Sequence, residues 1–167
     1  MALTEWDYEE IRQLFARYSQ TLDLGDADGF AACFAADGAL DTSGLTQGPG
    51  GVWRGQEALR ALVADLRERT AGRVRQSALN PLIDGDGTTA SATSYAVVTQ
   101  AYVDGARGET GDTASSLATT GIFFDEFVKV DGHWLFALRM FRHDGLPEVL
   151  DLVRTPGRVG PDLERIA

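Results

Sequence analysis

Apolar residues recur at helical spacing near the start of the chain. Thr4 and Asp7 have the spacing of a capping pair, and Gly25 follows the last apolar position. The apolar face between them consists of Ile11, Leu14, Phe15, Tyr18 and Leu22. This pattern predicts a first helix that ends just before Gly25.

Two further helices follow. Asp26 can cap a short one, whose buried side consists of Phe30, Cys33 and Phe34. The second is predicted from Gln56 to about Arg69, because leucine and valine recur there at helical spacing and Gly72 ends the pattern. Residues 37–38 are expected to form a turn, residues 39–42 a short strand and residues 43–51 a loop.

The remaining sequence is typical of β-structure. Aspartate and glycine pairs at 84–87 and 131–132 are hairpin signals, and residues 104–114 form a longer polar connection. Four β-branched and aromatic segments are expected to be strands: 74–83, 90–103, 121–130 and 134–143.

Helices followed by a long sheet predict an α+β domain. Such a sheet buries one face only if it curls around helices on that side. We therefore expect a curved antiparallel sheet wrapped around the N-terminal helices, forming a cone with an internal pocket over residues 1–145. Residues 146–167 are expected to be a helical extension or tail.

Strand alternation predicts which side chains share a face of this sheet. In the absence of bulges, one strand places Gln76, Ala78 and Asn80 together. The last strand places Leu135, Ala137, Arg139, Phe141 and His143 together. Polar groups among apolar ones are what a ligand pocket requires.

Composition excludes several classes of function. The chain has 167 residues and a net charge of -10, which would repel nucleic acids and anionic membranes. Cys33 is the only cysteine and is expected to fill the core, so neither a disulfide nor a cysteine metal cluster is expected. The first residues lack the pattern of a leader and no segment has the length of a membrane span, so we expect a cytoplasmic protein. The two histidines, His133 and His143, are ten residues apart on different sides of the last hairpin, so no metal site is expected.

Five motifs occur in a familiar order: Tyr18-x4-Asp23-x-Gly25-Asp26-x-Asp28, Phe34-Ala35-x-Asp37-Gly38, Trp53-Arg54-Gly55, Asn80-Pro81 and Asp131-Gly132-x-Trp134. The chain thereby resembles the SnoaL-like branch of the nuclear transport factor 2-like superfamily, which includes scytalone dehydratase, ketosteroid isomerase and polyketide cyclases. The resemblance extends from about Ile11 to Asp144. It implies the cone fold, whereas one fold hosts many chemistries.

The resemblance places Asp23 at the position of the acidic residue that points into the cone in dehydratase-like and cyclase-like members. A carboxylate beside an apolar cavity has a raised pKa, which suits it to proton transfer at neutral pH. The alternative is that Asp23 only caps the next helix or accepts hydrogen bonds from the turn.

Gln76 is the main departure from the dehydratase pattern, which has histidine at this place, four residues before the asparagine that matches Asn80. A glutamine amide can orient a substrate oxygen but cannot act as a base. Two alternatives remain open. His143 could enter the pocket from the last strand, or Asp23 could move the proton itself while Tyr18 stabilises an enolate.

Arg139 could bind a carboxylate or enolate in the pocket, or it could pair with Asp125 or Glu126 on the neighbouring strand. Trp53 and Tyr95 are candidates for the wall of the substrate pocket, although aromatic residues in strands are usually core.

These residues suggest an enzyme of small-molecule metabolism that needs no cofactor. It would perform acid/base cyclisation, isomerisation or dehydration on a hydrophobic, cyclic or polyketide-like substrate. The alternative is a non-catalytic small-molecule-binding or assembly protein on the same fold. The sheet face outside the cone leads us to expect a homodimer or larger homo-oligomer.

Overall fold

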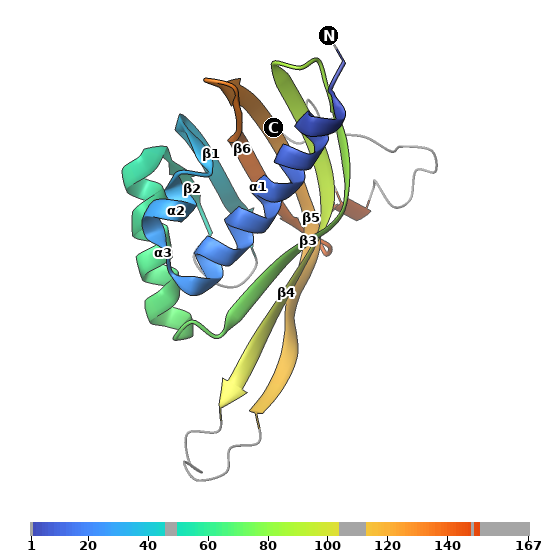
Figure 1. Cartoon of the computed structure of the whole chain (residues 1–167). Helices are drawn as coiled ribbons and strands as arrows, with labels where there is room; N and C mark the ends of the chain where they lie inside the picture. Colours follow the sequence, from blue (N-terminus) through green and yellow to red (C-terminus); the bar gives the residue numbers. More distant parts are fainter. Residues whose placement is uncertain (1, 46–49, 104–112, 148, 151–167) are drawn as a thin grey trace.

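The computed structural model describes residues 2–45, 50–103, 113–147 and 149–150. Within these ranges the chain forms three helices and six strands (Figure 1). They are α1 (Glu5–Leu24), α2 (Ala27–Ala31), β1 (Phe34–Gly44), β2 (Val52–Arg54), α3 (Gly55–Thr70), β3 (Val74–Gly85), β4 (Thr89–Val103), β5 (Thr113–Val130) and β6 (His133–His143).

The strands form one sheet in the order β2-β1-β6-β5-β4-β3. The predicted α+β class is confirmed: the sheet is curved and unclosed, and all three helices lie on one side of it (Figure 1). The expectation of a wholly antiparallel sheet is wrong at one place, because β1 and β6 run parallel. Sequence patterns show neighbours along the chain, whereas this pair joins segments separated by α3 and four other strands.

Local signals along the chain produce the expected ends of α1 and the expected beginning of α2, but α2 ends at Ala31, so Cys33 and Phe34 lie beyond it instead of on its buried side. The Thr4 hydroxyl accepts the backbone N–H of Asp7, and the Asp7 carboxylate accepts the backbone N–H of Thr4. Gly25 ends α1 with a φ of 78°, and Asp26 caps α2. Each of these contacts satisfies helix-end groups that have no partner within the helix.

The prediction for residues 37–42 needs correction. The expected turn at Asp37 and Gly38 lies inside β1, which is longer than the predicted strand. The pairing of β1 with β6 shifts between Phe34 and Ala39. Gly38 lies so close to the carbonyl oxygen of Phe136 that a Cβ would approach it to 2.7 Å. A turn-forming sequence therefore marks an irregularity within a strand.

Two β-bulges change which side chains face the helices. In β3 the pairing shifts between Leu79 and Leu82, and Asn80 has a φ of 52°. In β6 the extra residue is Ala137, because Glu126 pairs with Leu138 and Phe127 with Phe136. Arg139 and His143 therefore share the inner face with Trp134 and Phe136, but not with Ala137 as simple alternation predicted.

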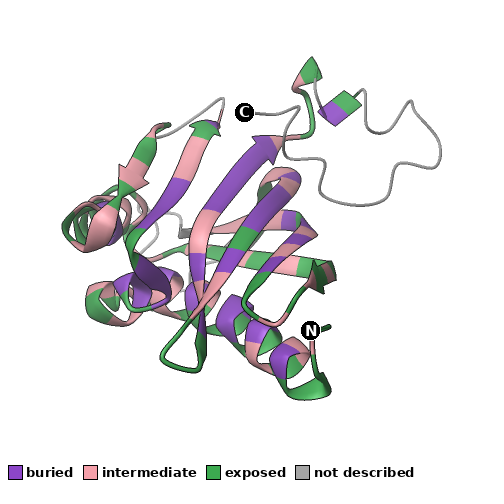
Figure 2. Ribbon diagram, turned by 90° about the horizontal axis from the view of Figure 1, so that it is seen from above, coloured by how far each residue is buried: buried purple, intermediate pink, exposed green. Residues whose placement is uncertain are grey.

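The core lies between α1 and the inner face of the sheet. Phe15 makes edge contacts with Phe127 and Phe136, at centroid distances of 5.8 and 5.9 Å. One turn later Tyr18 contacts Phe136 at 5.7 Å and Phe34 at 6.1 Å. The buried stripe of α1 faces this aromatic layer (Figure 2). The sheet thus curls around a helix whose large rings hold the two layers together.

No helix in the described part of the chain has the length and apolar character needed to span a membrane. The predicted extension or tail at 146–167 lies mostly outside the described residues, as does most of the predicted connection 104–114.

Asp7 joins the start of α1 to the sheet. Its carboxylate accepts hydrogen bonds from Lys129 Nζ at 2.6 Å and from Trp134 Nε1 at 2.8 Å, in addition to those from Thr4. Led by the hydrogen bond from Lys129, these donors hold the pKa of Asp7 well below its usual range. The charged carboxylate is therefore part of the folded structure.

Replacing Asp7 with Asn is expected to lower the free energy of unfolding at pH 7 by about 2–4 kcal/mol, because Lys129 loses its partner. The pKa of Asp7 is lowered on folding, so its contribution is present above the unfolded value near 4 and is lost as pH falls below it. The difference between wild type and D7N in urea denaturation should therefore shrink between about pH 5 and pH 2. D28N is the control, because Asp28 pairs with Arg60 on the surface. A difference in free energy of unfolding between wild type and D7N that stays constant across this pH range would contradict the prediction.

Candidate active site

A cavity of about 400 Å³ opens between the helices and the inner face of the sheet. Its apolar wall is formed by Leu22, Leu40, Leu45, Leu62, Leu66, Val74, Val98, Ala118, Phe123 and Phe141. Its polar lining consists of Tyr18, Thr42, Arg69, Thr70, Gln76, Gln100, Thr119 and His143. An apolar chamber with a few convergent polar groups is typical of a small-molecule site.

Tyr18 comes from the buried stripe of α1 and lines this cavity. Its ring is held by Phe30, Phe34, Phe123 and Phe136. Its hydroxyl makes no hydrogen bond to another described residue. Burial raises the pKa of the phenol, and the nearby positive charge of Arg139 limits that rise. Tyr18 therefore remains neutral and can donate a hydrogen bond to a ligand.

His143 lines the same cavity from the end of β6. The backbone N–H of Gly145 donates to His143 Nδ1 at 2.9 Å. Since Nδ1 accepts this bond, the neutral ring carries its hydrogen on Nε2. His143 can therefore offer an Nε2–H donor.

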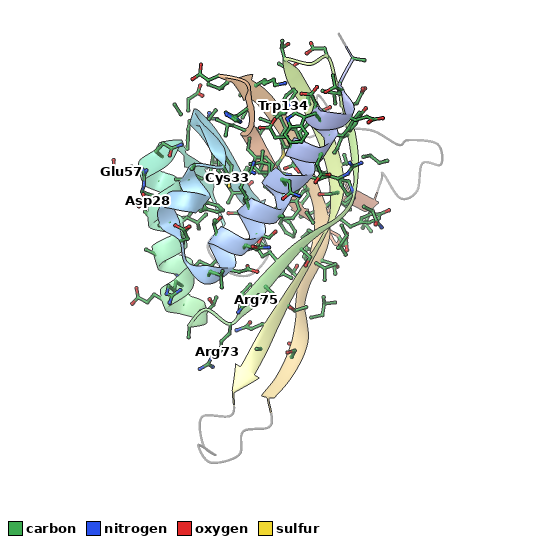
Figure 3. The ribbon with its side chains drawn as sticks, in the orientation of Figure 1. Asp28, Cys33, Glu57, Arg73, Arg75 and Trp134 are labelled. Atoms are coloured by element: carbon green, nitrogen blue, oxygen red, sulfur yellow. The ribbon has the colours of Figure 1, made fainter. Side chains whose placement is uncertain are left out.

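The structure brings Asp23 and Gln76 together. The backbone N–H of Gln76 lies 3.2 and 3.1 Å from the two carboxylate oxygens of Asp23. Burial raises the pKa of Asp23 to about 6, and the rise is limited by this N–H and by Arg75, labelled near the beginning of β3 in Figure 3. The Gln76 side chain lines the large cavity.

Asp23 itself lies in a small crevice beside the cavity. The crevice and the cavity share four wall residues: Leu22, Leu66, Thr70 and Val74. Asp23 is thus next to the chamber, although it is not part of its lining.

Comparisons with known proteins agree with this architecture. Residues 4–140 match the model of the SnoaL-like domain. The chain belongs to the SnoaL-like domain family. No curated protein sequence matches it.

Solved structures extend the comparison. Rv3472 from Mycobacterium tuberculosis, described as a protein of unknown function, is 31% identical, with 86% of this chain and 75% of that chain covered and a TM-score of 0.69. Aln2 from a Streptomyces species is 27% identical, with coverages of 92% and 98% and a TM-score of 0.70. An NTF2-like protein with a cystatin-like fold from Novosphingobium aromaticivorans shares the fold at 22% identity, with coverages of 90% and 90% and a TM-score of 0.73.

Arg139 of this SnoaL-like domain is fully buried and does not line the cavity. It faces Asp125 across the β5–β6 pair, with Nε 3.6 Å from Oδ1, which is the ion-pair alternative considered from the sequence. Its guanidinium carbon lies 3.8 Å from the centroid of Phe123 and 4.2 Å from that of Tyr18. Phe15 and Phe136 complete this aromatic cage at 5.2 and 4.9 Å.

Neither charged group in this pair is fully satisfied. The guanidinium nitrogens and both Asp125 oxygens are buried without a hydrogen-bond partner among the described residues. Burial raises the pKa of Asp125 to about 7, and the charge of Arg139 limits the rise. Such unpaired groups in a core are costly and call for a functional explanation.

Besides Asp23 and Arg139, three more predicted site residues of this SnoaL-like domain lie outside the cavity lining. Asn80 is exposed, because the β3 bulge takes it out of the alternation that begins at Gln76. Tyr95 is 58% exposed. Its neighbours Ser94 and Ala96 are buried, so strand alternation places Tyr95 on the outer face of the sheet. Trp53 packs from β2 against the main core instead of lining the cavity.

Gln100, Thr42 and Thr119 line the cavity but were missed from the sequence. The signal for Gln100 was available, since it is in phase with Ala92 and Ala96 along β4, and both are buried. Thr119 was hidden by the bulge between Val98 and Thr99, where the pairing with β5 shifts. In the part of the chain that the structure describes, no three histidine, cysteine, aspartate or glutamate side chains are grouped to hold a metal.

Replacing Asp125 with Asn is expected to remove a pH dependence of stability. The raised pKa means that the folded state holds the Asp125 proton more tightly than the unfolded state, so the wild type loses stability as pH rises from about 4 to about 7. D125N is expected to exceed the wild type in free energy of unfolding by about 2–4 kcal/mol at pH 8 and to match it near pH 4. Urea denaturation at pH 4 and pH 8 measures both free energies of unfolding. A difference between D125N and the wild type that is the same at both pH values would contradict the raised pKa of Asp125.

Proposed function

We propose that this protein is a SnoaL-like enzyme of small-molecule metabolism that performs acid/base chemistry on a hydrophobic, cyclic or polyketide-like substrate. The observation that carries the proposal is the convergence of Tyr18, Gln76 and His143 on one largely apolar chamber, beside an Asp23 whose pKa is raised to about 6. A base with a pKa near the working pH, together with fixed donors for an oxyanion, is what enolisation requires.

In the proposed reaction, the Asp23 carboxylate removes a proton from a carbon next to a substrate carbonyl, through one bridging water from its crevice. The C–H electron pair forms a carbon–carbon double bond, and the π pair of the carbonyl moves to its oxygen, which becomes an enolate oxygen. The Tyr18 hydroxyl and the Nε2–H of His143 donate to that oxygen, and the Gln76 amide orients the substrate. Return of the proton from Asp23 to another carbon of the conjugated enolate gives isomerisation. Its transfer to a departing hydroxyl on the β-carbon releases water and gives dehydration. Attack of the enolate carbon on a second carbonyl, followed by transfer of the proton to the new alkoxide oxygen, gives cyclisation.

A second function has one observation in its favour. The Asp23 oxygens already accept the backbone N–H of Gln76, and Gln76 stands where the dehydratase pattern has histidine. A protein that binds the same class of molecule without converting it would show these features too.

Asp23 is tested by solvent deuterium exchange into 2-tetralone, a bicyclic ketone with enolisable C–H bonds, followed by NMR. The wild type is expected to accelerate exchange, with a rate that rises as pH passes through about 6 and then levels off. D23N should lower the rate by about 10²–10⁴-fold and abolish this pH dependence, whereas D23E should retain part of the rate. Binding of 2-tetralone without accelerated exchange would favour the binding protein and overturn the proposed chemistry.

Tyr18 is tested with the same assay. Y18F keeps the ring that packs against Phe30 and Phe34 but removes the hydroxyl. We expect kcat for exchange to fall by about 10²–10³-fold with little change in KM, because the oxyanion donor acts mainly in the transition state. Y8F is the matched control, since Tyr8 is not part of the cavity lining. An equal loss in Y8F, or a change in KM alone, would contradict this role.

A further inference from the structure

The lining of the cavity has an unusual charge distribution for so acidic a chain. The protein carries 25 aspartate and glutamate residues and a net charge of -10. None of the described residues that line the cavity is an aspartate or glutamate, and Arg69 is the lining residue with a permanent charge. Apart from Asp23 in the neighbouring crevice, the chamber is therefore separated from the negative charge that dominates the rest of the molecule.

A second positive charge lies behind the wall of the chamber. The Arg139 guanidinium stacks on Tyr18 and Phe123, and both of these rings line the cavity. One aromatic ring therefore lies between the Arg139 charge and a ligand bound in the cavity. Because Arg139 is fully buried, its field acts through a medium of low dielectric and is felt more strongly than that of a surface cation.

The countercharge on Asp125 cancels this field only in part. The closest approach of the two groups is 3.6 Å, and the Asp125 oxygens accept no hydrogen bond from the guanidinium. The ring of Phe123 separates Arg139 from the chamber. The Asp125 carboxyl lies farther along β5 than this ring, so it cancels the field less on the side of the chamber.

Tyr18 transmits the effect of this buried cation. A cation on the face of a phenol ring draws electron density from it and makes the hydroxyl a stronger hydrogen-bond donor. The Tyr18 hydroxyl is unused by the described residues, so an anionic oxygen in the cavity can accept its hydrogen bond.

We infer that the chamber selects flat, conjugated molecules that carry a negative charge, and that Arg139 supplies this selectivity through the rings of Tyr18 and Phe123. The substrate class is thereby narrowed to aromatic acids and to phenols or cyclic ketones bound as phenolates or enolates. Arg139 is a positioning residue in this scheme, because it does not touch the ligand. The inference rests on the proposed function in placing the substrate in this cavity.

The test compares two probes of matched shape, 2-naphthoate and 2-naphthamide, by isothermal titration calorimetry at pH 8, where Asp125 is ionised because its pKa is raised only to about 7. The first is an anion and the second is neutral, and neither can undergo the proposed reaction. We expect the wild type to bind naphthoate at least about tenfold more tightly than naphthamide. Equal affinities, or failure of both probes to bind at millimolar concentration, would overturn the inference.

Variants of the buried pair shift the affinity ratio in opposite directions. D125N removes the countercharge, so the preference for naphthoate should increase by a further severalfold. The double variant D125N/R139M removes both charges and fills the space with an apolar side chain, so the preference should disappear. Circular dichroism checks the fold of each variant. If the double variant does not fold, D125N alone decides, because an unchanged or smaller ratio would overturn the inference.

Surface cations provide the controls. R60Q changes an exposed arginine that pairs with Asp28 away from the cavity, and should leave the ratio unchanged. R69Q should lower naphthoate binding at low salt only, because Arg69 is largely exposed and its field is screened. The Arg139 effect should persist at high salt, and its loss there would overturn the assignment to a buried charge.

This outcome is separable from that of the proposed function. Selective binding of naphthoate together with no exchange into 2-tetralone would support the inference and reject the catalytic proposal. Exchange by the wild type with equal affinities for the two probes would do the reverse.

Discussion

The packing of α1 on the inner face of the sheet is the constraint on which the rest of the structure depends. Phe15 and Tyr18 contact rings from β5 and β6, while the Asp7 carboxylate anchors the beginning of the helix to Lys129 and Trp134. A curved sheet can cover only a bounded area of one helix. After Tyr18, the next buried residue of α1 is the smaller Leu22, and both residues line the chamber.

This arrangement places reactive groups at the boundary between a packed core and an open cavity. Tyr18 belongs to both, because it is packed in the aromatic core and also lines the cavity. Asp23 lies just over one helical turn further along α1 and is only partly enclosed. The same helix therefore holds a neutral donor and a carboxylate of raised pKa in fixed positions, at no further cost in conformational entropy.

The buried Arg139 is the most expensive feature of the core. Its nitrogens lack hydrogen-bond partners among the described residues, and the rings around it compensate only in part. An apolar side chain in its place would pack without this penalty. A cost of this kind is commonly retained at functional sites, and the position behind Tyr18 and Phe123 connects the charge to the cavity.

The sequence by itself determined the local structure. Helical spacing, the Thr4–Asp7 capping pair, Gly25 and the Asp131–Gly132 turn act over a few residues, so they predicted the helices, the last hairpin and the α+β class. These features do not depend on how distant segments meet. The family resemblance placed Asp23 in the cone and Gln76 at the histidine position, but the hydrogen bonds between them join residues 53 apart in the sequence and are known from the structure alone.

Only the tertiary structure decided which side chains reach the cavity. Bulges at Asn80 and Ala137 reverse the alternation within two strands, so Asn80 moves to solvent while Arg139 and His143 share the inner face with Phe136. The parallel pairing of β1 with β6 and the burial of Arg139 against Asp125 also depend on long-range contacts. A one-residue shift in register exchanges the two faces of a strand, and the local sequence does not indicate where such a shift occurs.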